Sequence, residues 1–442
     1  MSIPEVDQTI FALASGSGKA GIAVFRISGR SAIKAYKILS KKSVPKPRCA
    51  VRARLFDPTS KEVLDDGLAI YFAAPASFTG EDVIELHVHG GRAVVAGMTA
   101  ALNLIQDVRL AEAGEFTRRA FDNDKLDLTA AEGLADLINA ETAAQRRQAQ
   151  RQLRGDLGVI YDSWRSRLLE AIALFEAEID FSDEDLPPGL KERVAEQVAG
   201  INKEITEHLD DNGHGQVLRD GLHIAIIGPP NAGKSSLLNR LSKRDVAIVS
   251  EKAGTTRDVI EVYLELDGYP VIIADTAGLQ ESGDAIELEG IRRAEERASQ
   301  SDLKLVVFDG AVWPEKDAKT LELIDENTFV VINKSDLIKQ TKTDYLAISS
   351  KTGDGLKSLL DILKKEVLER CNVSASPALT RTRHRSALGD CCDSLQRFQI
   401  APEAELKAED LRLAARALGR ITGRVDVEEV LDIIFSEFCI GK

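Results

Sequence analysis

A glycine-rich segment between a strand and a helix holds the residues best suited to bind phosphate. The apolar run 222–227 is followed at once by residues 228–235, which read GPPNAGKS, and a helical pattern opens at Ser236. In this strand–loop–helix context, backbone N–H groups wrap phosphates and the helix N-terminus favours their negative charge. Lys234 is placed to reach the β- and γ-phosphates as a catalytic cation, and the Ser235 hydroxyl is placed to bind Mg²⁺. The segment predicts a P-loop nucleotide site.

Two further segments predict the rest of the phosphate and Mg²⁺ site. Residues 275–278 read DTAG after the apolar run 271–274. Asp275 can hold Mg²⁺ through water, and Gly278 lets a backbone N–H approach the γ-phosphate. Residues 254–258 read GTTRD, and a threonine at this point completes the Mg²⁺ shell when GTP is bound. Thr256 is the preferred candidate and Thr255 is the alternative.

The base is predicted from residues 333–336, which read NKSD and close the apolar run 329–332. The Asp336 carboxylate can accept hydrogen bonds from guanine N1–H and the 2-amino group. Adenine lacks both donors, so it would leave a buried carboxylate unpaired. Asn333 would support guanine N7 and the loop, and residues 349–351, which read SSK, would form the second base loop. Together these segments predict a GTP site.

The order of strand-like and helix-like patterns predicts several domains. Residues 1–120 mix both patterns and indicate an α+β domain, whereas 121–220 and 372–442 are helical. Residues 221–371 alternate strand and helix, as in a doubly wound sheet, with a hairpin at Asp267-Gly268. Residues 129–132 read TAAE, a capping-box pattern that predicts a helix start. We therefore expect a multidomain α/β plus all-α protein whose P-loop domain is inserted into a helical domain.

Composition narrows the class of protein further. The chain has 442 residues, 44% hydrophobic and 29% charged, without an apolar run long enough to span a membrane and without a secretory signal pattern at its start. Five cysteines in no zinc-site spacing suit a reducing cytoplasm. The net charge of −14 means that any role with RNA needs a local basic patch or a partner protein.

The motifs resemble those of one family, the tRNA uridine-5-carboxymethylaminomethyl modification GTPases (MnmE). The resemblance is carried by GTTRD, DTAGL and NKSD, and by the terminal FCIGK at 438–442. Residues 77–82 (SFTGED), 114–117 (GEFT) and 124–128 (DKLDL) also match, so the likeness spans nearly the whole chain. It implies an N-terminal tetrahydrofolate-binding, dimerising domain, a helical domain and an inserted GTPase. It also implies a homodimer that works with the flavoprotein MnmG, which carries FAD, in a heterotetramer or larger complex.

In this family the reaction adds a carboxymethylaminomethyl or aminomethyl group to C5 of the tRNA wobble uridine. The resemblance implies that K⁺ replaces an arginine finger and is held by Asn231, Ser250, Lys252 and Thr255. It places the catalytic acid at Glu287, with Glu281 and Glu289 as competitors. The predicted GTP-binding residues are Asn231, Ala232, Gly233, Lys234, Ser235, Ser236, Ser250, Glu251, Lys252, Ala253, Gly254, Thr255, Thr256, Asp275, Thr276, Ala277, Gly278, Asn333, Lys334, Ser335, Asp336, Ser349, Ser350 and Lys351.

The resemblance also implies a site for a 5,10-methylene or 5-formyl tetrahydrofolate. Its matched positions are Arg26, Glu85, Lys125 and Lys442, with surface ion pairing as the alternative for Arg26 and Glu85. Cys439 is a candidate for the modification chemistry or for packing of the terminus. The sequence alone also predicts that His87 and His89 share one strand face. Two histidines without a third ligand seldom form a metal site, so a structural role is favoured.

Three functional hypotheses remain open from the sequence. The first is a K⁺-dependent GTPase that drives tRNA modification. The second is a GTP-switch protein for ribosome assembly, which would share the GTPase motifs but not the N-terminal domain or the CIGK terminus. The third is a scaffold whose GTP site gates assembly while MnmG performs the chemistry. Binding of a one-carbon folate by this chain separates the first from the third.

Overall fold

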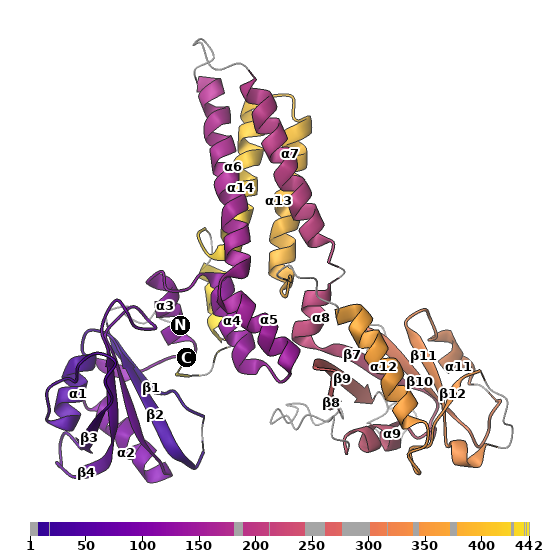
Figure 1. Ribbon diagram of the computed structural model, residues 1–442, viewed down its shortest axis with the longest axis horizontal. Coiled ribbons are helices and arrows are strands. Elements are labelled where there is room, and N and C mark those ends of the chain that lie inside the picture. The colour runs from indigo at the N-terminus through magenta and orange to yellow at the C-terminus, as the bar shows by residue number, and fades with distance from the viewer. Residues whose placement is uncertain are drawn as a thin grey trace, which may run out of the picture. The chain divides into compact units, whose positions relative to one another are not determined.

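The computed structural model describes most of the chain as two compact units (Figure 1). The described residues are 8–16, 18–180, 189–211, 213–243, 261–275, 301–315, 317–338, 344–371, 378–425, 428–436, 438 and 440–441. The first unit comprises Met1–Ala135, Gln152–Arg167 and Ala415–Lys442, and the second comprises Asp136–Arg151 and Leu168–Ala414. No helix within the described ranges combines the length and the apolar character needed to cross a membrane.

The first unit is built on a six-stranded sheet with the order β3-β4-β5-β2-β1-β6. Its neighbouring strands are antiparallel, except that β6 runs parallel to β1. The strands are β1 (Thr9–Leu13), β2 (Ala20–Ser28), β3 (Val51–Phe56), β4 (Val63–Phe72), β5 (Val83–Gly90) and β6 (Val108–Leu110). The strand-like patterns expected within residues 1–120 include the apolar run 22–27, which lies in β2, and the alternating run 82–89, which matches β5.

Alternation along β2 divides this sheet into two different faces. Phe25 and Ile27 are fully buried in one core with residues of α1 (Ala32–Ser40) and α2 (Arg92–Asn103). Arg26 lies between them and therefore points to the opposite face, where its cross-strand partner is Glu85. That second face also holds Phe116 from α3 (Glu115–Asp122), in a smaller cluster with Ile10.

The helix start predicted at Thr129 is wrong by a short distance. Helix α4 (Leu128–Asn139) begins one residue earlier, and Asp127 caps it. The Asp127 Oδ1 atom accepts hydrogen bonds from the Ala130 N–H at 2.8 Å and from the Thr129 hydroxyl at 2.7 Å. An aspartate carboxylate satisfies the free N–H groups of a first turn as well as threonine does, so the preceding residue took the role.

The end of the chain also differs from the prediction of helix to the terminus. Helix α15 (Glu428–Ser436) ends, and Ile440 then forms an isolated antiparallel bridge with Ala113. Gly441 takes a φ of +104°, and a Cβ there would lie 2.5 Å from the Leu13 carbonyl oxygen. The close approach of two backbones, which requires glycine at this point, ends the helical pattern.

The second unit contains another six-stranded sheet with the order β12-β11-β10-β7-β9-β8. It is parallel except for the antiparallel edge pair β8–β9. The strands are β7 (Leu222–Ile227), β8 (Glu261–Leu266), β9 (Tyr269–Asp275), β10 (Leu303–Asp309), β11 (Thr328–Asn333) and β12 (Leu346–Ala347). The hairpin predicted at Asp267-Gly268 joins β8 to β9, and both turn residues have positive φ, as a two-residue type I′ turn requires.

Both faces of this parallel sheet are covered. One core joins Ile224 and Ile226 to apolar side chains of α9 (Lys234–Leu241) and α12 (Leu356–Cys371). On the other face, Ala225 and Ile227 pack with Trp313 and neighbours that flank α11 (Ala318–Glu322). A short 3₁₀ helix, η1 (Ser335–Leu337), follows β11.

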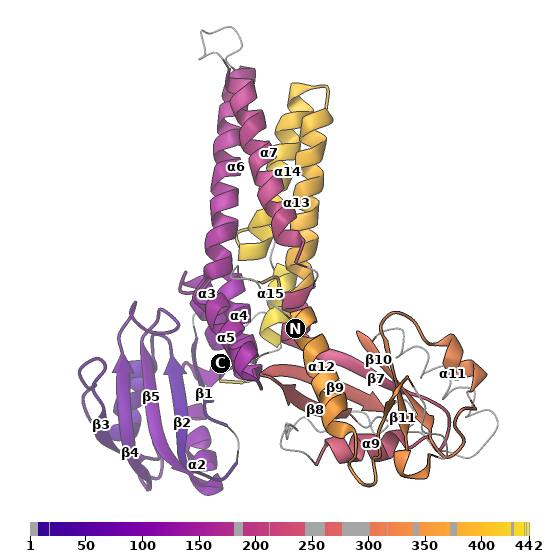
Figure 2. The ribbon, with the colours of Figure 1, turned by 45° about the vertical axis from the view of Figure 1, so that its right-hand side comes forward.

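Long helices from both ends of the chain pack together in the second unit. Val194, Val198, Ile201 and Ile205 of α7 (Leu190–Leu209) are fully buried, and α7 packs on α13 (Thr382–Ile400). Figures 1 and 2 show these two helices side by side with α6 (Asp156–Asp180) and α14 (Ala404–Thr422). The segments before and after the sheet therefore build one helical layer. The shorter helices are α5 (Ala143–Leu153) and α8 (His214–Asp220).

Candidate nucleotide-binding site

The loop between β7 and α9 has the shape of a phosphate-binding loop because two glycines allow it. Gly228 has a φ of +153° and Gly233 a φ of +89°. A Cβ at Gly228 would lie 2.2 Å from the Val307 carbonyl oxygen, and one at Gly233 would lie 2.3 Å from Asn333 Nδ2. Asn231, an exposed residue of the loop, also has a backbone φ in the left-handed region, at +64°. Only this backbone path brings the loop against its neighbours and starts α9 at Lys234.

Lys234 is held inside the loop by the loop's own carbonyl groups. Its Nζ donates to Gly228 O at 2.7 Å and to Pro229 O at 2.9 Å, and the residue is 6% exposed. Burial lowers the pKa of Lys234 below its ordinary value, while the negative charge of Asp275 acts in the opposite direction. The cation is thus positioned at the mouth of the loop, where phosphate oxygens would bind.

The oxygen atoms of Ser235 and Asp275 meet beside Lys234. The Ser235 hydroxyl donates to Asp275 Oδ2 at 2.5 Å, and Asp275 is 1% exposed at the end of β9. Hydroxyl and carboxylate oxygens are the hard ligands that Mg²⁺ prefers. The donor set therefore fits Mg²⁺, with Ser235 as the direct ligand and Asp275 as its orienting partner.

One side-chain amide links the phosphate loop to the base-recognition loops. Asn333 is 1% exposed at the end of β11, and its Nδ2 donates to Ala232 O at 2.9 Å. Its Oδ1 accepts hydrogen bonds from the backbone N–H and the hydroxyl of Ser350 at 3.0 and 2.9 Å. The amide uses both its donor and its acceptor side to hold three loops in register.

Asp336 lies beside this link with its carboxylate held by Ser349. The Ser349 hydroxyl donates to Asp336 Oδ1 at 2.7 Å, and this hydrogen bond lowers the pKa of Asp336. Lys334 has a φ of +59°, and its Nζ donates to Asp309 Oδ2 at 2.6 Å. Asp336 thus presents a carboxylate acceptor, which suits the N1–H and 2-amino donors of guanine.

Several predicted site residues fall outside the described part of the chain. Among the remaining predicted residues, the structure brings the P-loop, Asp275 and the two base loops together, with Ser236, Ser335 and Lys351 in the same segments. Those outside are Ser250, Glu251, Lys252, Ala253, Gly254, Thr255, Thr256, Thr276, Ala277, Gly278, Glu281, Glu287, Glu289, Cys439 and Lys442.

In the first unit, Arg26 and Glu85 form a half-buried ion pair on the second face of the sheet. Arg26 Nε and Nη2 donate to Glu85 Oε1 at 3.1 and 3.0 Å. The Arg26 guanidinium also lies 5.7 Å from the ring centres of both Phe78 and Phe116. Lys125 lies beside the loop that carries Phe78, since a Cβ at Gly80 would be 3.2 Å from its Cε. The ion pair expected as the alternative to folate contacts is thus present, within an aromatic setting.

The two histidines of β5 contact different acidic groups. His89 Nδ1 lies 2.8 Å from Asp65 Oδ1, whereas His87 Nε2 lies 3.5 Å from Glu85 Oε2. Within the described residues, His87 Nε2 is buried and has no hydrogen-bond partner. The described residues contain no group of three or more His, Cys, Asp or Glu side chains arranged to hold a metal ion. The polar edge of His87 therefore lies next to the free oxygen of Glu85.

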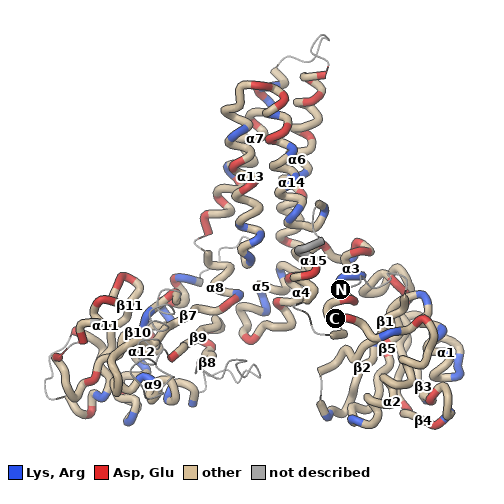
Figure 3. The backbone as a smooth tube through the Cα atoms, turned by 180° about the vertical axis from the view of Figure 1, so that it is seen from behind, with Lys and Arg blue, Asp and Glu red and all other residues tan. Residues whose placement is uncertain are grey.

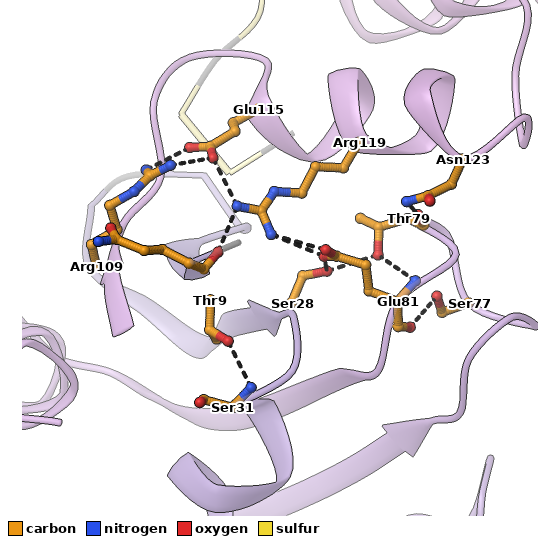
Figure 4. A network of polar contacts seen from close by, with 11 residues as sticks. Thr9, Ser28, Ser31, Ser77, Thr79, Glu81, Arg109, Glu115, Arg119 and Asn123 are labelled. Carbon is orange, nitrogen blue, oxygen red and sulfur yellow. Dashed lines mark hydrogen bonds and ion pairs between the residues drawn. The ribbon is translucent and has the colours of Figure 1, made fainter. Parts of the chain in front are cut away.

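A buried ionic network beside Arg26 was missed from the sequence (Figure 4). Arg119 of α3 donates to both carboxylate oxygens of Glu81 at 3.0 and 3.1 Å, to Glu115 Oε1 at 3.0 Å and to Gln8 O at 2.7 Å. Arg109 donates to the two Glu115 oxygens at 2.8 and 2.6 Å. The network fixes α3 against the loop 77–82.

This network explains why two of the matched motifs belong together. The motifs SFTGED and GEFT contain Glu81 and Glu115, whose common partner is Arg119. They also contain Phe78 and Phe116, the two rings that flank Arg26. The network thereby holds the aromatic setting of the Arg26–Glu85 pair. The only signal in the sequence was the presence of charged residues among apolar ones.

The parallel sheet, the glycine-shaped loop and the linked base loops define a P-loop nucleotide-binding protein of the GTPase class. Two family models match the chain: "GTP-binding protein TrmE N-terminus" over residues 9–125 and "MnmE helical domain" over residues 128–439. The chain is similar to proteins named "tRNA modification GTPase MnmE". The one from Paramagnetospirillum magneticum is 56% identical over 99% of this chain and all of the relative.

Two further relatives of that name are also similar to this chain over nearly its whole length. The protein from Parvibaculum lavamentivorans is 53% identical over 98% of this chain and all of its own length. The protein from Rhodospirillum rubrum is 50% identical over 98% of this chain and 99% of its own. The chain therefore belongs to the MnmE family of tRNA modification GTPases.

Proposed function

We propose that this chain hydrolyses GTP in the service of tRNA modification. The observation that carries the proposal is full-length identity of 56% to a relative named as a tRNA modification GTPase. The geometry of the second unit supports it, because the P-loop, Asp275 and the linked base loops form one nucleotide site. The resemblance narrows the reaction to C5 of the wobble uridine, with a carboxymethylaminomethyl or aminomethyl group as the product.

Each part of the nucleotide site has a defined role in this proposal. Lys234 and the P-loop N–H groups bind the phosphates, and Asp336 reads N1–H and the 2-amino group of guanine. Ser235 holds Mg²⁺ together with Thr256, and Mg²⁺ when bound neutralises phosphate charge. The ionised Asp336 carboxylate, oriented by Ser349, supports this reading of the base.

Hydrolysis in this proposal uses K⁺ and Glu287. The side-chain oxygen of the exposed Asn231, at the crest of the P-loop, is a suitable ligand for a hard monovalent cation. Ser250, Lys252 and Thr255 complete the K⁺ site by motif match. A cation at this point stabilises the charge that grows between the β- and γ-phosphates. Glu287 orients the attacking water.

The central test is GTP hydrolysis by the purified chain in KCl and in NaCl at equal ionic strength. We expect strong stimulation by K⁺ and its loss in Asn231→Ala. The matched control is Asn239→Ala, an exposed asparagine on α9 away from the loop, which should keep the K⁺ response. Equal slow rates in both salts would leave a GTP-binding switch and refute the K⁺ mechanism.

The assignment of the catalytic acid has its own test. Glu287→Ala should remove hydrolysis and keep GTP binding, because the water loses its orienting group while the phosphate and base contacts remain. Glu281→Ala and Glu289→Ala serve as matched controls and should retain turnover. Unchanged turnover in Glu287→Ala, or loss in one of the controls, would move the role to another residue.

For the first unit we propose a one-carbon tetrahydrofolate site around Arg26, Glu85, Lys125 and Lys442. The setting suits a flat, charged heterocycle, since it combines a carboxylate, a guanidinium and two aromatic rings. Glu85 Oε2, which Arg26 leaves free, suits the paired N–H donors of a pterin ring. Under the same proposal, domains at 1–120, 121–220, 221–371 and 372–442 form a homodimer that works with the FAD-containing MnmG.

Tetrahydrofolate binding by titration calorimetry tests this site independently of GTP. Glu85→Ala should abolish binding of 5-formyltetrahydrofolate while GTP hydrolysis is kept. Glu62→Ala, an exposed carboxylate in the same unit, is the matched control. Binding by Glu85→Ala at wild-type strength would refute the folate assignment and favour the scaffold hypothesis, in which Arg26 and Glu85 form a structural ion pair.

A further inference from the structure

One surface of the first unit carries a charge opposite to that of the whole chain. The chain has 71 acidic and 57 basic residues, yet every charged residue between Gly29 and Phe56 is lysine or arginine. This stretch covers α1, the following loop and the edge strand β3 (Figure 3). We call the lysine and arginine side chains of residues 34–54 the basic face. Such a local concentration of cations is unexpected in a chain with a net charge of −14.

The basic face is one continuous surface and not three separate segments. Helix α1 packs beside β3, and Lys42 Nζ donates to the Arg52 carbonyl oxygen at 3.4 Å. Lys41 Nζ lies 3.9 Å above the ring of Phe56, the last residue of β3. Lys34, Lys37 and Lys41 follow the three- and four-residue spacing of one helix face, and all three are exposed. The basic face thus continues round the free edge of β3, because Ala53 and Leu55 face the core under α1 while Arg52 and Arg54 point to the opposite face of the sheet.

Few anions offset these cations. Asp66 accepts hydrogen bonds from both Arg52, at 2.6 Å, and Arg54, at 3.2 Å. Asp107 lies 3.8 Å from Lys34. Lys37, Lys42 and Lys46 are exposed and form no ion pair with any residue that the structure describes. The face therefore keeps a positive surplus, which a polyanion would complement.

Structural explanations account for only part of the basic face. Lysines in the last turn of α1 suit the helix dipole, an effect worth less than about 1 kcal/mol, and this covers Lys37 and Lys41. Charged residues on an edge strand discourage aggregation, which covers Arg52 and Arg54. Arg48 donates to the Ala76 carbonyl oxygen at 2.7 Å and lies 5.8 Å from the centre of the Phe72 ring, which gives it a structural role as well. None of these reasons applies to Lys42 and Lys46 in the exposed loop.

We propose that the basic face binds the sugar–phosphate backbone of tRNA. The inference rests on the proposed function in tRNA modification. It names the surface through which a protein of net negative charge would bind RNA. Phosphate contacts position an RNA without reading its sequence. The α1 lysines lie on the side of the sheet opposite Arg26, and Arg52 and Arg54 share the side of Arg26 but lie on the edge strand β3, two positions from the strand β5 that carries Glu85. The basic face therefore acts in docking and not in the chemistry around Glu85.

Salt-dependent binding of a labelled, unmodified tRNA transcript to the full-length chain tests this proposal. The variant Lys37→Gln/Lys42→Gln/Lys46→Gln removes three exposed charges without touching either candidate site. Each phosphate contact contributes a slope of about 0.7–0.9 in log K against log salt. The variant should therefore lower the slope by about 2 to 3 and weaken binding on the order of 10²-fold at about 0.1 M salt.

The matched control changes the same net charge elsewhere. Lys191→Gln/Lys203→Gln/Lys365→Gln removes three exposed lysines of α7 and α12, each beside a glutamate. It should bind tRNA with the slope of the wild type. Equal weakening in both triple variants would show a general charge effect and overturn the proposal.

Two other outcomes would also overturn it. One is wild-type tRNA affinity and slope in the Lys37/Lys42/Lys46 variant. The other is unchanged tRNA binding with lost association of the flavoprotein partner, which would make the face a protein interface. K⁺-stimulated GTP hydrolysis measured on the same preparations separates this result from failure of the proposed function, because none of the substituted lysines lies in the nucleotide site.

Discussion

Replacement of Arg119 by methionine should destabilise the first unit strongly. Arg119 is 6% exposed and donates to Glu81, to Glu115 and to the Gln8 carbonyl group. Methionine fills a similar length but leaves two carboxylates without a common cation and one carbonyl without a donor. Removing one member of a buried ionic network costs about 3–5 kcal/mol. For a unit of this size that corresponds to a decrease of roughly 6–20 °C in the unfolding midpoint.

Tryptophan fluorescence can report this unit selectively. The chain has two tryptophans, of which Trp164 belongs to the first unit and Trp313 to the second. In a Trp313→Phe background, Trp164 is the remaining tryptophan, and its signal follows urea or thermal unfolding around the part of α6 that belongs to the first unit. The matched control is Arg52→Met, which removes a bidentate partner of Asp66 on the exposed surface. Solvent screens that pair, so its loss should leave the midpoint nearly unchanged.

The pH dependence of the same midpoint provides a second readout. Burial alone would raise the pKa of Glu115, but hydrogen bonds from Arg109 and the Glu112 N–H and the charges of Arg109 and Arg119 lower it below its ordinary value. A carboxyl group whose pKa is lower in the folded than in the unfolded state stabilises the fold at pH values above its unfolded pKa. This contribution is lost as the pH falls below about 4.5. Arg119→Met should flatten that loss. A variant within about 1 kcal/mol of wild type, with an unchanged acid limb, would refute the network as a stabilising element.

Three further changes probe the other local arguments. Gly233→Ala should abolish binding of a fluorescent GTP analogue in a folded protein, because its Cβ would lie 2.3 Å from Asn333 Nδ2 at a φ of +89°; wild-type affinity would contradict this. Asp336→Asn should weaken GTP binding on the order of 10²-fold and favour xanthosine triphosphate, since the amide offers a donor to the 2-oxo group; a retained guanine preference would contradict the pocket. Asp127→Ala should cost about 1 kcal/mol of stability through the lost helix cap, measured by Trp164 fluorescence, and no change would assign the cap elsewhere.

Short sequence patterns predicted the turn and the phosphate loop of the second unit well, because the conformation of each depends on residues that are close in sequence. The turn at Asp267-Gly268 requires positive φ at both positions, and aspartate followed by glycine supplies it. The P-loop likewise depends on glycines at fixed spacing between a strand and a helix. Each of these signals lies within a few residues of the structure that it specifies, so a single sequence is enough to find it.

Contacts between distant segments could not be predicted in the same way. Glu81 and Arg119 lie 38 positions apart, and Arg119 and the carbonyl group of Gln8 lie 111 positions apart. Nothing in the spacing of these residues indicates that they meet. The bridge between Ala113 and Ile440 depends on a close approach of two backbones, which also has no local signal. Contacts of this kind can be predicted only when the order of the strands in the sheet is already known.

The link through Asn333 shows how base recognition reaches the phosphate end of the site. The sequence assigned this residue to guanine N7 and the loop, yet one amide edge already supports Ala232 in the P-loop and the other holds Ser350. A change in the position of the second base loop therefore moves the Ser350 donors that hold Asn333 Oδ1, and with them the Asn333 Nδ2 donor to the P-loop carbonyl group. The protein's own hydrogen bonds already order these loops, so binding of the base does not have to order the phosphate loop. Discrimination for guanine and positioning of Lys234 are in this way properties of one connected set of loops.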